Sequence, residues 1–361
     1  MGNIIDYLKD KIYYIMGATV LLIIILIVIS SCGSGGSGGT YSAIESNMIK
    51  AAKKYYSSRE NKLPEEDSTS KVTIGTLVEL GLLKEVKDPK NKSNLCNGYV
   101  LTKKVDEEYV HTPFLTCKGN YEPEYLSDKI KSSGQDEYGN GIYEIDGEYV
   151  YRGDDVKNYV SFANKLWRIV MVDGTDNIEL VLNESTEEEY FWENSYNIDE
   201  QEKVGVTTNY FNTNIRKSLV KYYENNFTTD EKAKIVLKDL CIGALGRKED
   251  FNRQKECAKV QEGEYIGLLR VSDYQRASTD TNCTNRTQGQ CQNHNYLESS
   301  ASISSWLLNT VEENTYQVFA GFGIVSIDAA DTRSINPVIY LSSDIITVQG
   351  TGTIDEPFVI K

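Results

Sequence analysis

Histidine is scarce in this chain of 361 residues: it occurs twice, as His111 and His294. Ser-His-Asp or Cys-His catalysis needs a base next to the nucleophile. His111 lies in a short hairpin pattern and His294 beside a cysteine pair, and we interpret both as solvated loop residues. We therefore predict no catalytic residue and no enzymatic activity.

A basic surface is also lacking, because 53 acidic residues outnumber 38 Lys and Arg, giving a net charge of −15. Nucleic acids and anionic lipid headgroups both require clustered positive charge. The glycines at 350–353 precede neither a lysine nor a helix, so they do not form a phosphate-binding loop. We exclude nucleic acid as a partner.

Acidic residues cluster at two places without the spacing of a known site. Glu187, Glu188 and Glu189 are consecutive, and with Trp192 and Glu193 they suggest a glycosidase carboxylate pair. Three adjacent acids are more typical of a solvated turn. The second cluster does not match the spacing of an EF-hand calcium loop, so we interpret its acids as turn residues: Asp136, Asp146, Asp154 and Asp155. We expect no metal and no cofactor.

One long hydrophobic run is present, with no charged residue from Ile12 to Ile29. Eighteen helical residues at about 1.5 Å each cover roughly 27 Å, enough to cross a bilayer core. We predict a cytoplasmic segment at 1–11, a transmembrane helix or signal anchor at 12–31 and a Gly/Ser linker at 32–39. The sequence around Cys32 is similar to a lipobox, so an uncleaved anchor and a lipidated Cys32 both stay open.

Seven cysteines are present, and the six that follow the anchor lie along the sequence as three successive pairs. An even number outside the membrane favours disulfides in an oxidising compartment. The most economical pairing joins neighbours: Cys96 with Cys117, Cys241 with Cys257, and Cys283 with Cys291. The alternative is a partial zinc site formed by Cys283, Cys291 and His294, although no C-x-x-C motif occurs.

Residues 40–126 predict a helix followed by a hairpin. Ser42 and Glu45 have capping-box spacing, and apolar residues continue at helical intervals to Tyr55. A short helix is expected at 74–82, and alternating strands at 96–102 and 108–117.

The run AAKKYY, LP, GTLVELGLL and C-x-GYV after an apolar segment resembles pilin-like and pseudopilin-like proteins of low-GC Gram-positive bacteria. The resemblance covers about residues 12–126. The glutamate and peptidase motif expected early in a pilin helix are not found, so the resemblance implies a pilin-derived stalk.

Residues 127–158 are rich in Gly, Asp and Tyr and are interpreted as a connector. Residues 159–361 predict an α+β domain. Strands are expected at 166–172, 178–182, 316–327 and 337–341, helices at 214–223, 230–240 and 273–277, and a closing hairpin at 345–361. We expect Trp167 and Trp306 to pack in its core, because both lie in apolar runs.

The motifs NYVSFANKLWRIV, IGLLRVSDYQRAS and NPVIYLSSDIITVQGTGTIDEPFVI resemble an uncharacterised family of Gram-positive surface proteins. More distantly, a short helix, a later Trp and terminal strands look like the C-type-lectin-like fold. These resemblances imply display at the cell surface and carry no activity.

Exposed aromatics next to carboxylates and amides suit sugar or protein surfaces. We predict such a binding surface at Tyr190, Trp192, Glu193 and Tyr196. The predicted function is therefore a single-pass membrane protein whose extracellular domain binds a glycan, a cell-wall polymer or a surface protein. The alternatives are a component of a pilus-like or secretion apparatus and a surface enzyme acting on wall polymers.

Overall fold

The structure is a computed structural model, and it describes residues 40–65, 68–105, 107–194, 210–246, 253–283, 290–299, 305–311, 317–320 and 324–361. The predicted transmembrane helix at 12–31, Cys32 and Tyr196 lie outside these ranges. Within them, no helix is both long enough and apolar enough to span a bilayer.

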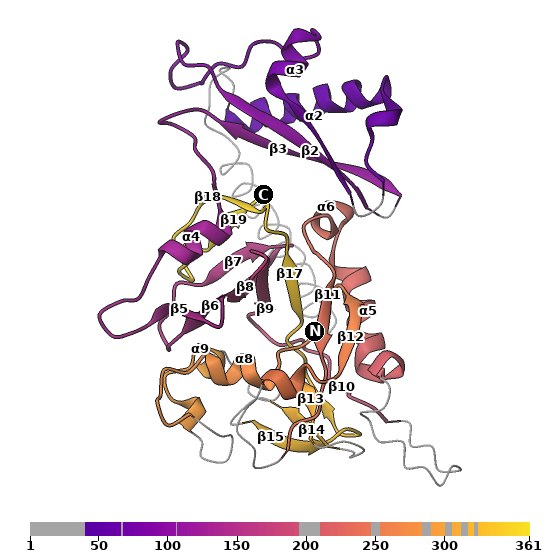
Figure 1. The fold of residues 1–361 in the computed structure, drawn as a ribbon, viewed down its shortest axis with the longest axis vertical. Coiled ribbons are helices and arrows are strands. Elements are labelled where there is room, and N and C mark those ends of the chain that lie inside the picture. Colours follow the sequence, from indigo (N-terminus) through magenta and orange to yellow (C-terminus); the bar gives the residue numbers. More distant parts are fainter. Residues whose placement is uncertain are drawn as a thin grey trace, which may run out of the picture.

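The described chain forms a mixed α+β structure with two hydrophobic cores, one made by residues 48–117 and the other by residues 126–358. Figure 1 shows the smaller unit above the larger one, with the C-terminus lying between them.

In the smaller unit, a long helix packs on an antiparallel sheet in which β2 lies between β1 and β3. Its elements are α2 (Tyr41–Ser57), η1 (Glu60–Lys62), β1 (Thr69–Thr73), α3 (Ile74–Glu79), β2 (Asn97–Val105) and β3 (Glu108–Thr116). The helix-plus-hairpin prediction is confirmed, but the cap is not Ser42. Thr40 caps α2 by accepting a hydrogen bond from the Ala43 N–H, and Glu45 is buried.

The larger unit is built on a sheet that contains nine strands in the described residues, ordered β17-β9-β8-β7-β19-β18-β4, with β6 on β8 and β5 on β6. Its strands are β4 (Glu124–Tyr125), β5 (Gly141–Ile145), β6 (Glu148–Arg152), β7 (Tyr159–Phe162), β8 (Lys165–Val172), β9 (Ile178–Leu182), β17 (Val338–Leu341), β18 (Ile346–Gln349) and β19 (Phe358–Ile360). β8 and β9 are mostly apolar because both of their faces are buried, although each also buries one charged side chain, Arg168 and Glu179.

Smaller sheets and short helices surround this central sheet. The remaining strands are β10 (Tyr190–Phe191), β11 (Lys238–Cys241), β12 (Val260–Glu264), β13 (Trp306–Thr310), β14 (Gln317–Ala320), β15 (Val325–Asp328) and β16 (Thr332–Arg333). The remaining helices are α4 (Leu126–Ser132), η2 (Tyr210–Asn212), α5 (Asn214–Asn226), α6 (Thr229–Lys232), α7 (Arg253–Glu256), α8 (Val271–Arg276), η4 (Gln290–Gln292) and α9 (Tyr296–Ser299).

Two predictions of local structure are wrong in the larger unit. Residues 127–158 do not form a separate connector: they supply α4, β5 and β6, and β6 pairs with β8 through Tyr149 and Val172. The helix predicted at 230–240 is wrong, because α6 stops at Lys232 and the chain then forms β11, which pairs with β12. The closing hairpin is confirmed by the antiparallel pairing of β18 with β19.

The predicted disulfide pairs are confirmed: Cys96–Cys117, Cys241–Cys257 and Cys283–Cys291 are all bonded. Cys96 immediately precedes β2 and Cys117 immediately follows β3, so this bond closes the open end of the hairpin. The zinc alternative is wrong, because Cys283 and Cys291 are bonded to each other and provide no thiolate ligand.

Candidate functional site

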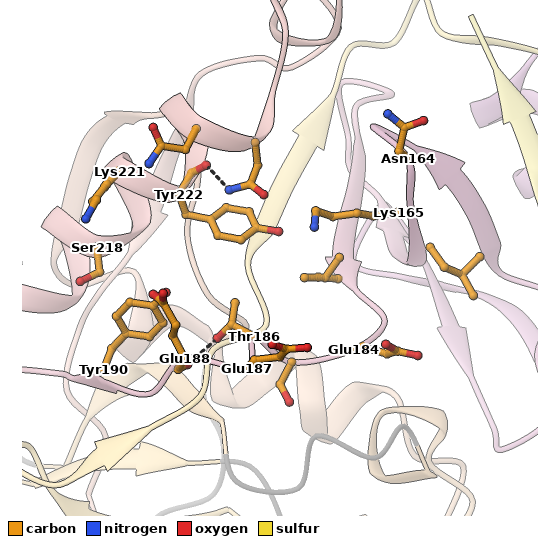
Figure 2. A pocket seen from close by; sticks show the side chains of 15 residues that line it. Asn164, Lys165, Glu184, Thr186, Glu187, Glu188, Tyr190, Ser218, Lys221 and Tyr222 are labelled. Atoms are coloured by element: carbon orange, nitrogen blue, oxygen red, sulfur yellow. Dashed lines mark hydrogen bonds between the residues drawn. The ribbon is translucent and has the colours of Figure 1, made fainter. Parts of the chain in front are cut away.

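A groove of about 800 Å³ opens on the larger unit between α5, the β7–β8 turn and the segment that follows β9. Figure 2 shows its side chains converging from these three elements. It is lined by Asn164, Lys165, Leu166, Leu182, Glu184, Ser185, Thr186, Glu187, Glu188, Tyr190, Ser218, Lys221, Tyr222, Asn225 and Asn226. Its volume is in the range of small-molecule sites, but its lining is much more polar than is usual for them.

The β7–β8 turn places Asn164 and Lys165 on the rim. Phe162 pairs with Lys165, and the two residues between them, Ala163 and Asn164, both have positive φ values of 52° and 56°. This is the backbone of a two-residue type I′ hairpin turn, whose twist matches that of the flanking strands.

The second wall follows β9 and is held by hydrogen bonds from Thr186. The Thr186 N–H donates to the Ile335 carbonyl at 2.9 Å, and its hydroxyl donates to the Glu188 carbonyl at 2.8 Å. The exposed Glu187 and Glu188 carboxylates are thus presented by a segment fixed to the rest of the unit.

Helix α5 forms the third wall and is amphipathic. Thr213 caps its N-terminus, and Ile215, Leu219 and Tyr223 face the core. Ser218, Lys221 and Asn225 recur at helical spacing and line the groove.

Two tyrosine hydroxyls at the groove differ in their partners. Tyr190 donates to Glu188 Oε2 at 2.9 Å, and burial together with this carboxylate raises the pKa of Tyr190 to about 12. Tyr222 is 9% exposed, and its hydroxyl oxygen has no hydrogen-bond partner among the described residues. Burial raises the pKa of Tyr222 to about 12, so its hydroxyl keeps its proton and can donate.

The ring of Tyr222 extends from α5 toward Lys165 across the cavity in Figure 2. Among the lining residues, neither Lys165 nor Lys221 is joined to another by a hydrogen bond in that view. The groove therefore contains a donor without a partner, two cations and three glutamates within one concave surface.

Only part of the predicted binding surface lies at this groove. Tyr190 lines it, whereas Glu193 does not, and Tyr196 lies outside the described residues. The prediction that Trp192 is exposed is wrong: it is 2% exposed, and its indole N–H donates to the Leu307 carbonyl at 3.3 Å. Its ring also packs against Tyr210, at 6.0 Å between centroids.

Sequence reasoning missed Tyr222 and Lys165. Tyr222 is in a helical pattern in which an aromatic residue is typical of core packing. Lys165 lies at the end of a hairpin turn, a position typical of a solvated charge. The consecutive Glu187 and Glu188 are exposed as predicted, but sequence alone did not place them opposite a helix.

Glu189 is removed from the groove by its own contacts. Its Oε2 accepts a hydrogen bond from the Thr332 hydroxyl at 2.8 Å, and it does not line the cavity. Of the acids considered for a glycosidase pair, Glu189 and Glu193 are therefore not at the groove, whereas Glu187 and Glu188 line it.

The two histidines lie in different environments. His294 is exposed, as predicted, and lies 3.2 Å from Asp154. The prediction of a solvated loop is wrong for His111, which is in β3, stacks on Tyr56 and contacts Thr102 at 2.9 Å. Burial lowers the pKa of His111 to about 4.

A buried charge cluster attaches α8 to the central sheet. Arg270 contacts both carboxylate oxygens of Asp273, at 2.7 and 2.8 Å, and lies 3.2 Å from Glu179 of β9. Burial and the nearby Asp273 charge raise the pKa of Glu179 to about 8 despite Arg270, whereas Arg270 holds the pKa of Asp273 low against burial. The raised pKa of Glu179 and the lowered pKa of Asp273 agree with the geometry, because the Arg270 guanidinium makes two short contacts with Asp273 and one longer contact with Glu179.

The acids considered for calcium do not form a site in the described residues, where no cluster of ligands suited to a metal is found. Asp136 instead accepts hydrogen bonds from the N–H groups of Tyr138 and Asn140, both at 2.8 Å. These contacts fit a turn acid, as predicted.

Comparisons with protein-family models, curated proteins and solved structures found no match to this chain. The resemblances to pilin-like and C-type-lectin-like proteins thus stay predictions.

Proposed function

We propose that this chain is a membrane-anchored binding protein whose extracellular part holds a polar ligand in the groove beside α5. The observation that carries the proposal is the groove itself: a polar concave surface of about 800 Å³ that contains a buried, unpartnered Tyr222 hydroxyl. Burying a hydroxyl without a partner is unfavourable, so its retention at a concave surface points to a ligand that supplies the partner.

The proposed location rests on the disulfides and on the sequence. Disulfides persist in oxidising compartments, and the bonds at 96–117, 241–257 and 283–291 fit an ectodomain. The uncharged run at 12–29 would anchor this ectodomain to the membrane, with the pilin-like unit as a stalk.

Binding is preferred to catalysis because the histidine that most triad-type sites use as a base is not found among the lining residues of the groove. Neither histidine is among its lining residues, and Glu188 is already hydrogen-bonded to Tyr190. The two alternatives, an apparatus component and a wall-polymer enzyme, become outcomes of the same experiment.

The test is a binding screen of the full chain, purified in detergent with its disulfides oxidised, against glycans, wall fractions and surface proteins. Ser218→Trp should abolish binding, because the indole would fill the groove from α5. Lys217→Trp is the matched control, since this exposed neighbour lies outside the lining.

Binding that survives Ser218→Trp would remove the groove from the proposal. No ligand together with stable co-purification of pilin-like proteins would support the apparatus component instead. Turnover of a wall polymer that depends on Glu187 or Glu188 would establish an enzyme.

A further inference from the structure

The mixture of chemical groups in the groove limits the class of ligand that can bind there. In the lining, three amides and three aliphatic hydroxyls lie among three glutamates and two lysines, while Leu166 and Leu182 are the only aliphatic side chains. A ligand that fits must offer both donors and acceptors at short intervals, because each lining group otherwise loses its hydrogen bond to water.

The charge of the lining argues against a strongly charged ligand. Three carboxylates face two ammonium groups, so the formal charges nearly cancel. A polyanion would be repelled by the glutamates and a polycation by the lysines. In each case this repulsion would offset the attraction to the oppositely charged side chains. An uncharged ligand avoids this conflict.

A peptide is a poorer match to the same surface. Peptides are held by an open strand edge or by pockets for apolar side chains. The lining includes no central-sheet edge strand: β17, the edge next to β9, is bridged at Leu341 by Ile235 and at Val338 by Gly267. With two leucines, the groove also has little apolar surface to bury.

The Tyr222 hydroxyl points to the part of the groove where such a ligand would be held. In Figure 2 it points toward Lys165, and burial raises its pKa to about 12, which further favours the protonated form that can donate. Lys165 carries its ammonium on a flexible side chain, which can move aside for a ligand that approaches this hydroxyl. The Tyr190 ring lies on the same side of the cavity as Ser218 (Figure 2), where it offers an aromatic edge or face to a sugar ring.

From these observations, we propose that the groove binds an uncharged saccharide chain and that the Tyr222 hydroxyl donates a hydrogen bond to one of its oxygens. Sugar hydroxyls both donate and accept, so they match the mixture of amides, carboxylates and hydroxyls. This inference rests on the proposed binding function and names its ligand class.

The experiment measures the affinity of the full chain, in detergent and with its disulfides oxidised, for tetrasaccharides of glucose, mannose and N-acetylglucosamine. Uronate and glucosamine tetrasaccharides, a polyol phosphate and an unrelated peptide are the comparison ligands. At least one uncharged tetrasaccharide should bind at least about tenfold more tightly than every comparison ligand.

Tyr222→Phe should weaken that binding by about five- to tenfold, the effect of losing one neutral hydrogen bond. Its melting temperature should stay equal to that of the wild type or rise, because the variant removes an unpaired buried hydroxyl. Tyr274→Phe is the matched control: the Tyr274 hydroxyl is also buried without a partner in the described part of the chain, but Tyr274 lies outside the groove. It should leave saccharide binding unchanged.

Asn225→Ala provides a second measurement that does not depend on a buried position, since Asn225 is exposed on α5 and lines the groove. It should weaken binding by about threefold. Saccharide binding that is unchanged in both Tyr222→Phe and Asn225→Ala would overturn the inference. A charged polymer or a protein that Ser218→Trp excludes would also overturn it, while leaving the proposed binding function intact; no ligand of any class would overturn both.

Discussion

At the scale of single residues, burial decides the roles of side chains that look alike in the sequence. Phe191 and Trp192 are consecutive aromatics among acids and amides, yet Phe191 is 39% exposed and Trp192 is 2% exposed. Phe191 is the last residue of β10, whereas Trp192 follows the strand and its indole N–H donates a hydrogen bond to the Leu307 carbonyl. The aromatic residue most suited to ligand stacking in the sequence is therefore a core residue.

Trp192→Ala should lower the free energy of unfolding by about 3–5 kcal/mol, because it removes a buried indole and leaves a cavity. Phe191→Ala should cost less than about 1 kcal/mol, because its ring is partly in solvent. Urea unfolding followed by circular dichroism measures both. Equal losses in the two variants would contradict the burial difference.

The Glu179 carboxyl should make stability depend on pH. Because its pKa is raised to about 8 in the folded protein, the folded state holds this proton more tightly than the unfolded state does. Its contribution to stability is therefore greatest below the unfolded pKa and falls as the pH rises toward 8.

Glu179→Gln removes this titration, so the variant should gain stability relative to the wild type between pH 5 and pH 8. Urea midpoints of both proteins at the two pH values provide the measurement. A stability difference that is the same at both pH values, or that changes in the opposite sense, would show that Glu179 is ionised throughout.

At the scale of elements, local pattern and tertiary context compete. The β2–β3 hairpin follows its sequence closely, with nine residues paired in register from Asn97–Thr116 to Val105–Glu108. Residues 230–240 do not, because α6 ends after one turn and Val236 then donates a hydrogen bond to the Tyr340 carbonyl. Contact with a distant strand overrides helical propensity there.

The Cys96–Cys117 bond should be the main covalent support of the smaller unit. Replacing both cysteines with alanine should cost about 3 kcal/mol, since the bond closes a loop with a sequence separation of 21 residues. In differential scanning calorimetry, the smaller unit should then unfold at a lower temperature than it does in the wild type.

The corresponding double variant of Cys283 and Cys291 opens a shorter loop, with a separation of 8, in the larger unit. It should leave the smaller unit's transition unchanged. A transition of the smaller unit that is insensitive to loss of Cys96–Cys117 would rule out this role for the bond.

At the scale of the whole molecule, the two units are joined through polar contacts. The Lys361 ammonium pairs with the buried Glu45 carboxylate and donates to the Tyr121 hydroxyl at 2.8 Å. Lys103 adds a hydrogen bond to the Ala233 carbonyl at 3.3 Å. Although burial disfavours the charged form, the contacts with Glu45 and Tyr121 raise the pKa of Lys361, which indicates that the ammonium is stabilised at this junction.

Lys361→Met should weaken the coupling between the units by about 2 kcal/mol, because it leaves Glu45 buried with only Tyr121 as a side-chain donor among the described residues. The smaller unit should then unfold at a lower temperature than the larger one in calorimetry. Lys87→Met is the control, because Lys87 and Glu85 form an exposed pair whose loss should cost less than about 0.5 kcal/mol. An unchanged transition in Lys361→Met would mean that this contact does not couple the units.

The mixed α+β class, the hairpin, the disulfide pairs and the burial of Trp167 and Trp306 could all be predicted from the sequence. Each depends on residues close together in the chain: an alternating pattern, a cysteine spacing or a local apolar run. Of the three predicted site residues that the structure describes, Tyr190 lines the groove and Trp192 and Glu193 do not. The prediction that Trp192 is exposed was wrong because a short mixed segment does not reveal which of its side chains the rest of the unit covers.

The sequence by itself determined the secondary structure of the strongly periodic segments, since this depends on short-range geometry. It favoured the pairing of neighbouring cysteines, which the structure then confirmed. Only the tertiary structure decided that Lys165, Glu187 and Tyr222 share one groove. They come from a hairpin turn, a loop and a helix that are brought together by burial of the core between them. That convergence depends on packing over the whole unit, which no local pattern in the chain encodes.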